Sequence, residues 1–125
     1  MAPLEVAGRS AVLVPMTGST WEQRAGELNL VYASVEVQAG PVCWDFGAPD
    51  VIGVFFIELI LDGATVARAQ ASPELNARET VTLSAHLNSD LVASRAVEVR
   101  VFNTCERVED VGTVTRSSFD VAAIG

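Results

Sequence analysis

The apolar residues of this chain recur mainly at every second position and not at the 3.6-residue spacing of a helix. Apolar and polar residues alternate over Val31 to Gln38, Val81 to Asn88 and Val97 to Val101. A period of two places successive side chains on opposite faces of a strand. These segments therefore predict strands with one buried face and one exposed face.

The segment from Phe55 to Leu61 departs from this alternation. One of its faces carries Phe55, Ile57, Leu59 and Leu61, and on the other face Phe56 and Ile60 flank Glu58. A strand that is apolar on both faces is typical of the interior of a sheet that is covered on both sides. We expect its outer face to meet either another part of the chain or a partner molecule.

Glu58 is the single charge in this apolar strand, and a carboxylate is costly to bury without a partner. We therefore expect Glu58 to lie on the outer face, in a cross-strand contact with an arginine such as Arg68 or Arg100. A structural role of this kind is favoured over a catalytic carboxylate.

Turn residues separate the apolar segments at the spacing of an antiparallel β-sandwich. Asp62 and Gly63 predict a hairpin turn, because Gly63 is able to take positive φ and Asp62 is able to bond its own backbone. Residues 18–26 predict either a short helical turn capped at Ser19 or Thr20 or a strap over the sandwich. The seven expected strands are Val6–Pro15, Glu27–Gln38, Val51–Leu61, Thr65–Gln70, Glu79–Leu87, Arg95–Asn103 and Thr113–Ala122.

A chain of 125 residues is the size of one domain with one core. We expect a single all-β antiparallel sandwich over residues 1–125. Its predicted core includes Val31, Val35, Phe55, Ile57, Leu59, Val81, Leu83, Val97, Val99 and Val101.

The stretch FFIELILDGATVARAQASPELNARETVTLSAHLNSDLVASRAVEVRVFN resembles the middle of immunoglobulin-like sandwich modules of the bacterial adhesion and fibronectin-III-like kinds. It shares their succession of an apolar strand, a DG hairpin, a short strand, a loop, a TVTL strand and a VEVRV strand. This resemblance covers about 50 central residues and implies an immunoglobulin-like fold of about seven strands. It implies no particular function, because such sandwiches serve many. The inter-sheet disulfide and tyrosine corner of antibody domains do not carry over.

In that topology the loops after the second and sixth strands emerge at one end of the sandwich. The resemblance thus implies that Cys43 and Cys105 are neighbours, with Cα atoms within about 7 Å. They are either disulfide-bonded or two separate thiols. A reducing cytosol opposes the bond, and assembly into an extracellular particle permits it.

The same two loops form a candidate binding tip. Its candidate residues are Trp44, Asp45, Phe46, Asp50, Glu106 and Arg107. Aromatic faces among carboxylates suit a sugar or a protein surface, but a loop that plugs its own sandwich has the same composition. Carboxylates also leave calcium as an alternative, although their spacing matches no calcium loop. We expect no metal and no cofactor.

The formal charge is −8, and all eight basic residues are arginines spread singly along the chain. Nucleic acid and anionic membranes are therefore not expected partners. The one histidine, His86, lies mid-strand and is expected to face solvent. With no nucleophile motif and no phosphate-binding loop, no enzymatic activity is predicted.

The apolar chain ends extend this picture. Leu4, Val6, Val12 and Val14 near the start and Phe119, Val121 and Ile124 near the end need cover. Edge strands without lysine invite a partner strand. We expect a structural or assembly protein that attaches to or builds a larger particle, such as a bacteriophage capsid decoration or tail component. Residues 1–10 are a candidate docking arm.

The expected partner is protein, either further copies of this chain or a larger shell. We expect synthesis in the cytoplasm without a signal peptide, since no basic region precedes the first apolar run, and the virion as one destination. The alternative function is a carbohydrate-binding or adhesion module that uses the aromatic tip.

Overall fold

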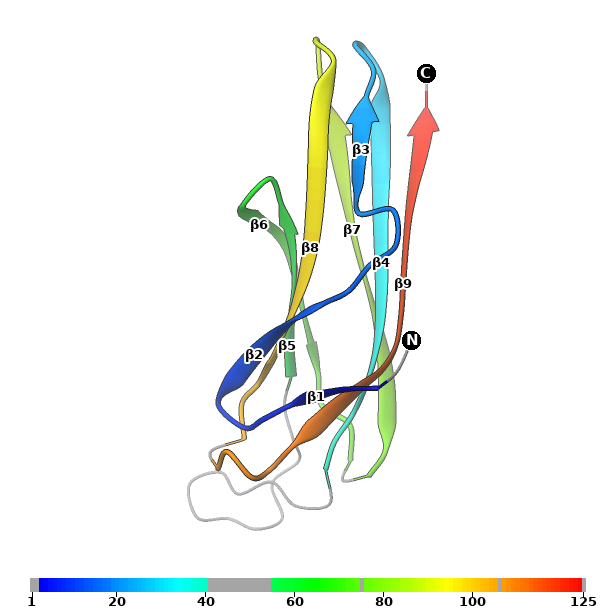
Figure 1. Ribbon diagram of the computed structural model, residues 1–125. Coiled ribbons are helices and arrows are strands. Elements are labelled where there is room, and N and C mark those ends of the chain that lie inside the picture. The colour runs from blue at the N-terminus through cyan, green and yellow to red at the C-terminus, as the bar shows by residue number, and fades with distance from the viewer. Residues whose placement is uncertain (1–2, 41–54, 75, 106, 125) are drawn as a thin grey trace.

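The computed structural model describes residues 3–40, 55–74, 76–105 and 107–124, and within these residues it is all-β, without a helix (Figure 1). The strands are β1 (Leu4–Val6), β2 (Ser10–Val14), β3 (Thr20–Gln23), β4 (Leu28–Gln38), β5 (Phe55–Leu61), β6 (Ala64–Ala71), β7 (Arg78–Asn88), β8 (Ala93–Asn103) and β9 (Gly112–Ile124). Part of the fold prediction is therefore confirmed: the described chain is antiparallel β structure.

The strands form two sheets. The first has the order β1-β9-β4-β7, and the second has the order β2-β8-β5-β6, with β3 also paired to β8. Every pairing among the described strands is antiparallel. We call these the first sheet and the second sheet. From β4 to β9 the chain crosses repeatedly between them, so that β4, β7 and β9 lie in one sheet and β5, β6 and β8 in the other.

The segment before β4 differs from the prediction, which placed one strand at Val6–Pro15. The chain instead forms β1 at the edge of the first sheet and then crosses to the second sheet, where β2 and β3 pair with successive parts of β8. Neither a helical turn nor a strap occupies Thr20–Gln23, because these residues are β3. One edge of β8 is thus covered by two short strands with a break between them (Figure 1).

The core lies between the sheets and draws on both. Nine of the ten predicted core residues are buried, and Val81 is half-buried against the same cluster. The alternation explains this outcome: Val31, Ala33, Val35 and Val37 of β4 are all buried, whereas Tyr32 between them is exposed. The architecture is therefore sandwich-like, as the period of two predicts.

The hairpin between β5 and β6 turns at Asp62 and Gly63, whose φ angles are 47° and 89°. Both lie in the left-handed region, as the DG sequence predicts. The Asp62 side chain does not bond its own backbone. Its carboxylate accepts from the backbone N–H of Ala96 (2.9 Å) and from Arg95 (2.9 Å), so it joins the hairpin to β8.

Asn103 connects three segments at the end of β8. Its side-chain amide donates to the carbonyl oxygens of Val6 and Asp110, both at 2.9 Å, and its oxygen accepts from the backbone N–H of Cys105 at 3.0 Å. Asn103 and Val6 have no exposed surface. Val6 belongs to the candidate docking arm, residues 1–10, and its side chain packs in the core.

Candidate functional site

Most of the predicted loop tip lies outside the described residues. This applies to Cys43, Trp44, Asp45, Phe46, Asp50 and Glu106. Arg107 is described, and its Nε lies 3.4 Å from Oε1 of Glu109, with both side chains exposed. Cys105 is buried at the end of β8. The composite tip and the proximity of Cys43 and Cys105 remain predictions.

The outer face of the second sheet carries the charged cluster that the sequence predicts. The strand register places Glu58 of β5 directly opposite Arg68 of β6 on one side and Arg100 of β8 on the other. Arg68 Nη2 lies 3.2 Å from Glu58 Oε2, and Arg100 Nη2 lies 2.8 Å from Oε1. The prediction named either arginine as a partner, and the carboxylate binds both.

Glu58 is held as an ionised group at this position. Its side chain is 10% exposed, and Thr65 also donates to Oε2, at 3.1 Å. The hydrogen bond from Arg100 lowers the pKa of the Glu58 carboxyl, and this outweighs the opposite effect of burial. The two arginines remain 66% and 43% exposed, so the cluster presents positive charge outward.

Apolar side chains surround this cluster on the same face. Leu13 of β2 lies beside Arg100, and Phe56 of β5 lies beside Phe102 of β8. Leu13 is 54% exposed and Phe56 is 36% exposed. Among the described residues no further strand packs over this side of the second sheet. The result is an open apolar face with an ordered ionic centre, which we call the β5 face.

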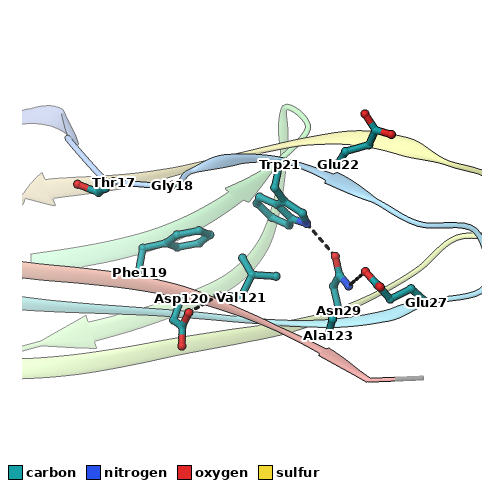
Figure 2. Close-up of a pocket in the computed structure, with 10 residues that line it drawn as sticks. All are labelled: Thr17, Gly18, Trp21, Glu22, Glu27, Asn29, Phe119, Asp120, Val121 and Ala123. Carbon is teal, nitrogen blue, oxygen red and sulfur yellow. Dashed lines mark hydrogen bonds between the residues drawn. The ribbon is translucent and has the colours of Figure 1, made fainter.

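A second feature is a groove of about 480 Å³ between β3 of the second sheet and β9 of the first (Figure 2). Its lining residues are Thr17, Gly18, Trp21, Glu22, Glu27, Asn29, Phe119, Asp120, Val121 and Ala123. The Trp21 and Phe119 rings lie side by side, with centroids 5.8 Å apart and planes inclined by 44°. We call this feature the Trp21 groove.

Hydrogen bonds fix the Trp21 ring in the groove. Its Nε1–H donates to Asn29 Oδ1 at 2.8 Å, and Asn29 Nδ2 donates to Glu27 Oε1 at 2.8 Å (Figure 2). Asn29 is 1% exposed. The buried Asn29 amide therefore sets the orientation of the Trp21 indole. The groove thus combines a fixed aromatic surface with the carboxylates of Glu22, Glu27 and Asp120.

Sequence reasoning did not find the Trp21 groove, because its two aromatic residues are almost a hundred positions apart in sequence. The available signal was weak. Trp21 belongs to a short segment without apolar alternation, and Phe119 belongs to an apolar terminal strand whose cover the sequence does not identify. The pairing of β9 with β4, which brings Phe119 beside Trp21, does not follow from either segment alone.

Within the described ranges, no three histidine, cysteine or acidic residues form a group that could hold a metal ion. His86 lies on β7 and is exposed, as predicted. No helix in the described part of the chain has the length and apolar character needed to cross a bilayer. Of the two features described above, the β5 face is flat and the Trp21 groove is concave.

No family model matches the chain, and no curated protein matches its sequence significantly.

Proposed function

We propose that this chain is a non-enzymatic structural or assembly protein, a subunit that joins copies of itself within a larger particle such as a bacteriophage capsid or tail. The observation that carries the proposal is the β5 face. It combines half-exposed Leu13 and Phe56 with the cluster in which Glu58 binds both Arg68 and Arg100.

The composition of the β5 face suits a protein partner. Aromatic residues and arginine are enriched in protein interfaces. The guanidinium groups of Arg68 and Arg100 are already oriented by Glu58, so less side-chain freedom is lost when a partner covers them. A stable contact of this kind buries on the order of 800 Å² on each partner.

The proposal includes an immunoglobulin-like architecture that departs from the constant type in its first, fourth and last strands. The strand β1 pairs with β9 and not with β4, and β6 pairs with β5 and not with β7. In constant-type immunoglobulin sandwiches the second strand pairs with the fifth, and the last strand shares a sheet with the third and sixth. The corresponding pairs β4–β7 and β5–β8 support the likeness. The last strand, β9, pairs with β4, so in this proposal it has joined the opposite sheet.

Protein is the proposed partner class, and the virion is the proposed final location. The charge of −8 and the absence of lysine count against nucleic acid and anionic membranes, which bind through basic patches. The carboxylates that line the Trp21 groove strengthen this argument, because they would repel phosphate groups.

Size-exclusion chromatography with light scattering tests the proposal. We expect the intact protein to be oligomeric and Phe56→Glu to shift it toward the monomer, because a charge is placed in the contact. Tyr32→Glu is the matched control. Tyr32 is an aromatic residue of similar exposure, 42%, on the outer face of the first sheet.

An intact protein that is monomeric at all concentrations would contradict self-assembly, and so would equal effects of the two substitutions. Deletion of residues 1–10 is a poor test of assembly, because it removes β1 and the fully buried Val6. A truncated chain would lose core packing together with any docking segment. Point substitutions on the β5 face avoid this ambiguity.

A carbohydrate-binding or adhesion module is the second candidate. The Trp21 groove favours it, because a fixed indole beside carboxylate and amide groups can stack on a sugar ring and bond its hydroxyl groups. Titration with simple methyl glycosides, followed by NMR at the Trp21 indole N–H, tests this candidate. Saturable shifts that Trp21→Ala abolishes would support it.

A further inference from the structure

The last part of β9 has an open side. On one side β9 pairs with β4 as far as Ile124, whereas on the other side β1 pairs only with residues 112–114. Among the described residues no strand pairs with this second side from residue 118 to residue 124. Figure 1 shows β9 extending past β1 along the edge of the first sheet.

The sequence of this open edge lacks most of the features that prevent another strand from pairing with it. Residues 118–124 read SFDVAAI, with no lysine and no proline, and Asp120 is the single charge. The irregularity in the β4–β9 register lies further back, between Glu36 and Val37. Natural edge strands are usually protected by charges, prolines or bulges. This one has little protection.

The backbone donors at the edge point outward. Val121 lies opposite Val31 of β4, yet its N–H donates to Oδ1 of Asp120 at 2.9 Å. The amide is therefore directed away from β4 and toward the open side. Because amide directions alternate along a strand, the N–H groups of Phe119 and Ala123 point to the same side. These three amides form a row along the open side. Another strand can bond to this row, and at Val121 its carbonyl oxygen would replace the Asp120 carboxylate as the acceptor.

The Trp21 groove lies along this edge and supplies contacts for side chains. Its lining includes Phe119, Val121 and Ala123 of the edge and Trp21 of β3 (Figure 2). A strand added to β9 would extend the first sheet and place every second side chain over the groove. An apolar side chain at those positions would cover the Trp21 and Phe119 rings.

Charge identifies the class of occupant. Glu22, Glu27 and Asp120 line the groove, and no arginine is among its lining residues. A second copy of this chain carries a charge of −8 and no lysine, so its approach is opposed by like charge. A basic strand from another protein is favoured.

We infer that the open edge of β9 and the Trp21 groove together accept an extended segment of a different protein by strand addition, with apolar residues facing the groove and basic residues beside its carboxylates. The inference rests on the proposed function only in that the partner is a protein. It uses a surface separate from the β5 face, so the two can fail independently.

The probe is a short, capped synthetic peptide of alternating valine and lysine, and its control has glutamate in place of lysine. With isotope-labelled protein, we expect the lysine peptide to shift the amide signals of Phe119, Val121 and Ala123 and the Trp21 indole signal. The glutamate peptide should leave them unchanged. Proline is tolerated where an edge N–H faces outward. Val121→Pro should therefore keep the fold and weaken binding about tenfold or more.

Val121→Ala is the matched control, since it shortens the same side chain and keeps the N–H, and it should bind like the intact protein. Circular dichroism checks that both variants fold. If Val121→Pro fails to fold, Glu22→Lys provides a second test. Glu22 is exposed on the groove, and reversing its charge should weaken the lysine peptide and strengthen the glutamate peptide.

Four results would overturn the inference: no shifts with the lysine peptide, equal binding of both peptides, equal binding by Val121→Pro and Val121→Ala, or no change of preference in Glu22→Lys. A lower molar mass of peptide-free Val121→Pro would instead assign the edge to a second copy. Shifts produced by methyl glycosides alone would assign the groove to sugar. Phe56→Glu should bind the lysine peptide normally, which separates this test from that of the β5 face.

Discussion

Glu58 is the residue whose chemistry is most constrained by its neighbours. It lies in the interior strand of the second sheet and binds two arginines from the strands on either side. Exposed ion pairs contribute little to stability, whereas loss of one partner from a covered pair is costly. The Glu58 cluster lies between these limits, because the carboxylate is covered and the guanidinium groups are half-exposed.

Glu58→Gln should lower the free energy of unfolding by about 1–2 kcal/mol, because the side chain keeps its shape but loses its charge, and its NH2 group replaces one of the two oxygens that accept hydrogen bonds. Urea unfolding monitored by circular dichroism measures this change. Glu98→Gln on the exposed face of β8 is the control and should change stability by less than about 0.5 kcal/mol. Equal losses in the two variants would show that the cluster has no special role.

The contribution of Glu58 to the free energy of unfolding should fall as the pH is lowered into the acid range. Its folded-state pKa lies below the ordinary value of 4.5, chiefly because Arg100 bonds the ionised form. Stability from this group is therefore fully present above pH 4.5 and is lost as the pH falls below 4.5 through the folded-state pKa. The difference in unfolding free energy between the intact protein and Glu58→Gln should be constant at neutral pH and shrink in acid. A difference that grows in acid would contradict the direction of the pKa shift.

Among the elements, β3 is the strand that the pattern of apolar and polar residues does not predict. Its inward positions are Trp21 and Gln23, and Gln23 has no exposed surface. The Gln23 amide donates to the carbonyl oxygens of Glu27 and Leu87, and its oxygen accepts from Arg95. A buried glutamine breaks the apolar alternation, so the sequence does not predict this strand. Its partners come from distant positions that only the fold brings together.

The connection from β1 to β2 depends on the small size of Gly8. A Cβ atom at this position would overlap the carbonyl oxygen of Arg107 and lie 2.8 Å from that of Cys105. Both obstacles are backbone atoms, which cannot move aside as a flexible side chain can. Gly8→Ala should therefore lower the free energy of unfolding by about 2–4 kcal/mol.

Gly18→Ala is the control for this prediction. Gly18 has a φ of 75°, and a Cβ atom there meets nothing within 4 Å. Its substitution should cost about 1 kcal/mol from backbone strain alone. Thermal or urea unfolding of both variants separates the two effects. A smaller loss in Gly8→Ala than in Gly18→Ala would show that the connection can move away from Arg107.

At the scale of the whole molecule, the sequence predicts the sheet interior better than its edges. The residues of β4 and β8 alternate because one face of each is buried, and β5 is apolar on both faces because it lies inside its sheet; the burial of all three strands follows the prediction. At the chain ends, the strand predicted at Thr113–Ala122 is present as β9, but the sequence does not predict which strands pair with β2, β3 and β9. The β9 sequence SSFDV, residues 117–121, contains no signal that predicts pairing with β4 and not with β8.

The two candidate sites also differ in how far the sequence predicts them. The partners of Glu58 follow from a local argument about the cost of a charge in an apolar strand, and both arginines lie on directly neighbouring strands. The Trp21 groove requires knowledge of which edges meet. Its two aromatic residues lie on different sheets and have no common sequence signal.

A bond between Cys43 and Cys105 is one of the two states that the sequence leaves open for this pair. It concerns the molecule as a whole, because it would close a loop of about 60 residues. The chain-entropy model gives such a closure a contribution of roughly 4 kcal/mol. We expect the purified protein to show no reactive thiol after unfolding without a reductant, and reduction to lower its unfolding temperature. The double variant Cys43→Ser/Cys105→Ser should match the reduced protein. Two free thiols under oxidising conditions would contradict this prediction.

The position of Asn103 has a consequence for chemical ageing. Its amide donates to the carbonyl oxygens of Val6 and Asp110, and deamidation would replace this donor with a carboxylate facing two acceptors. The folded chain holds the side chain in place, so attack by the following backbone nitrogen requires the end of β8 to open first. The extent of Asn103 deamidation in a stored sample would thus measure how often β1 and the end of β8 separate during storage.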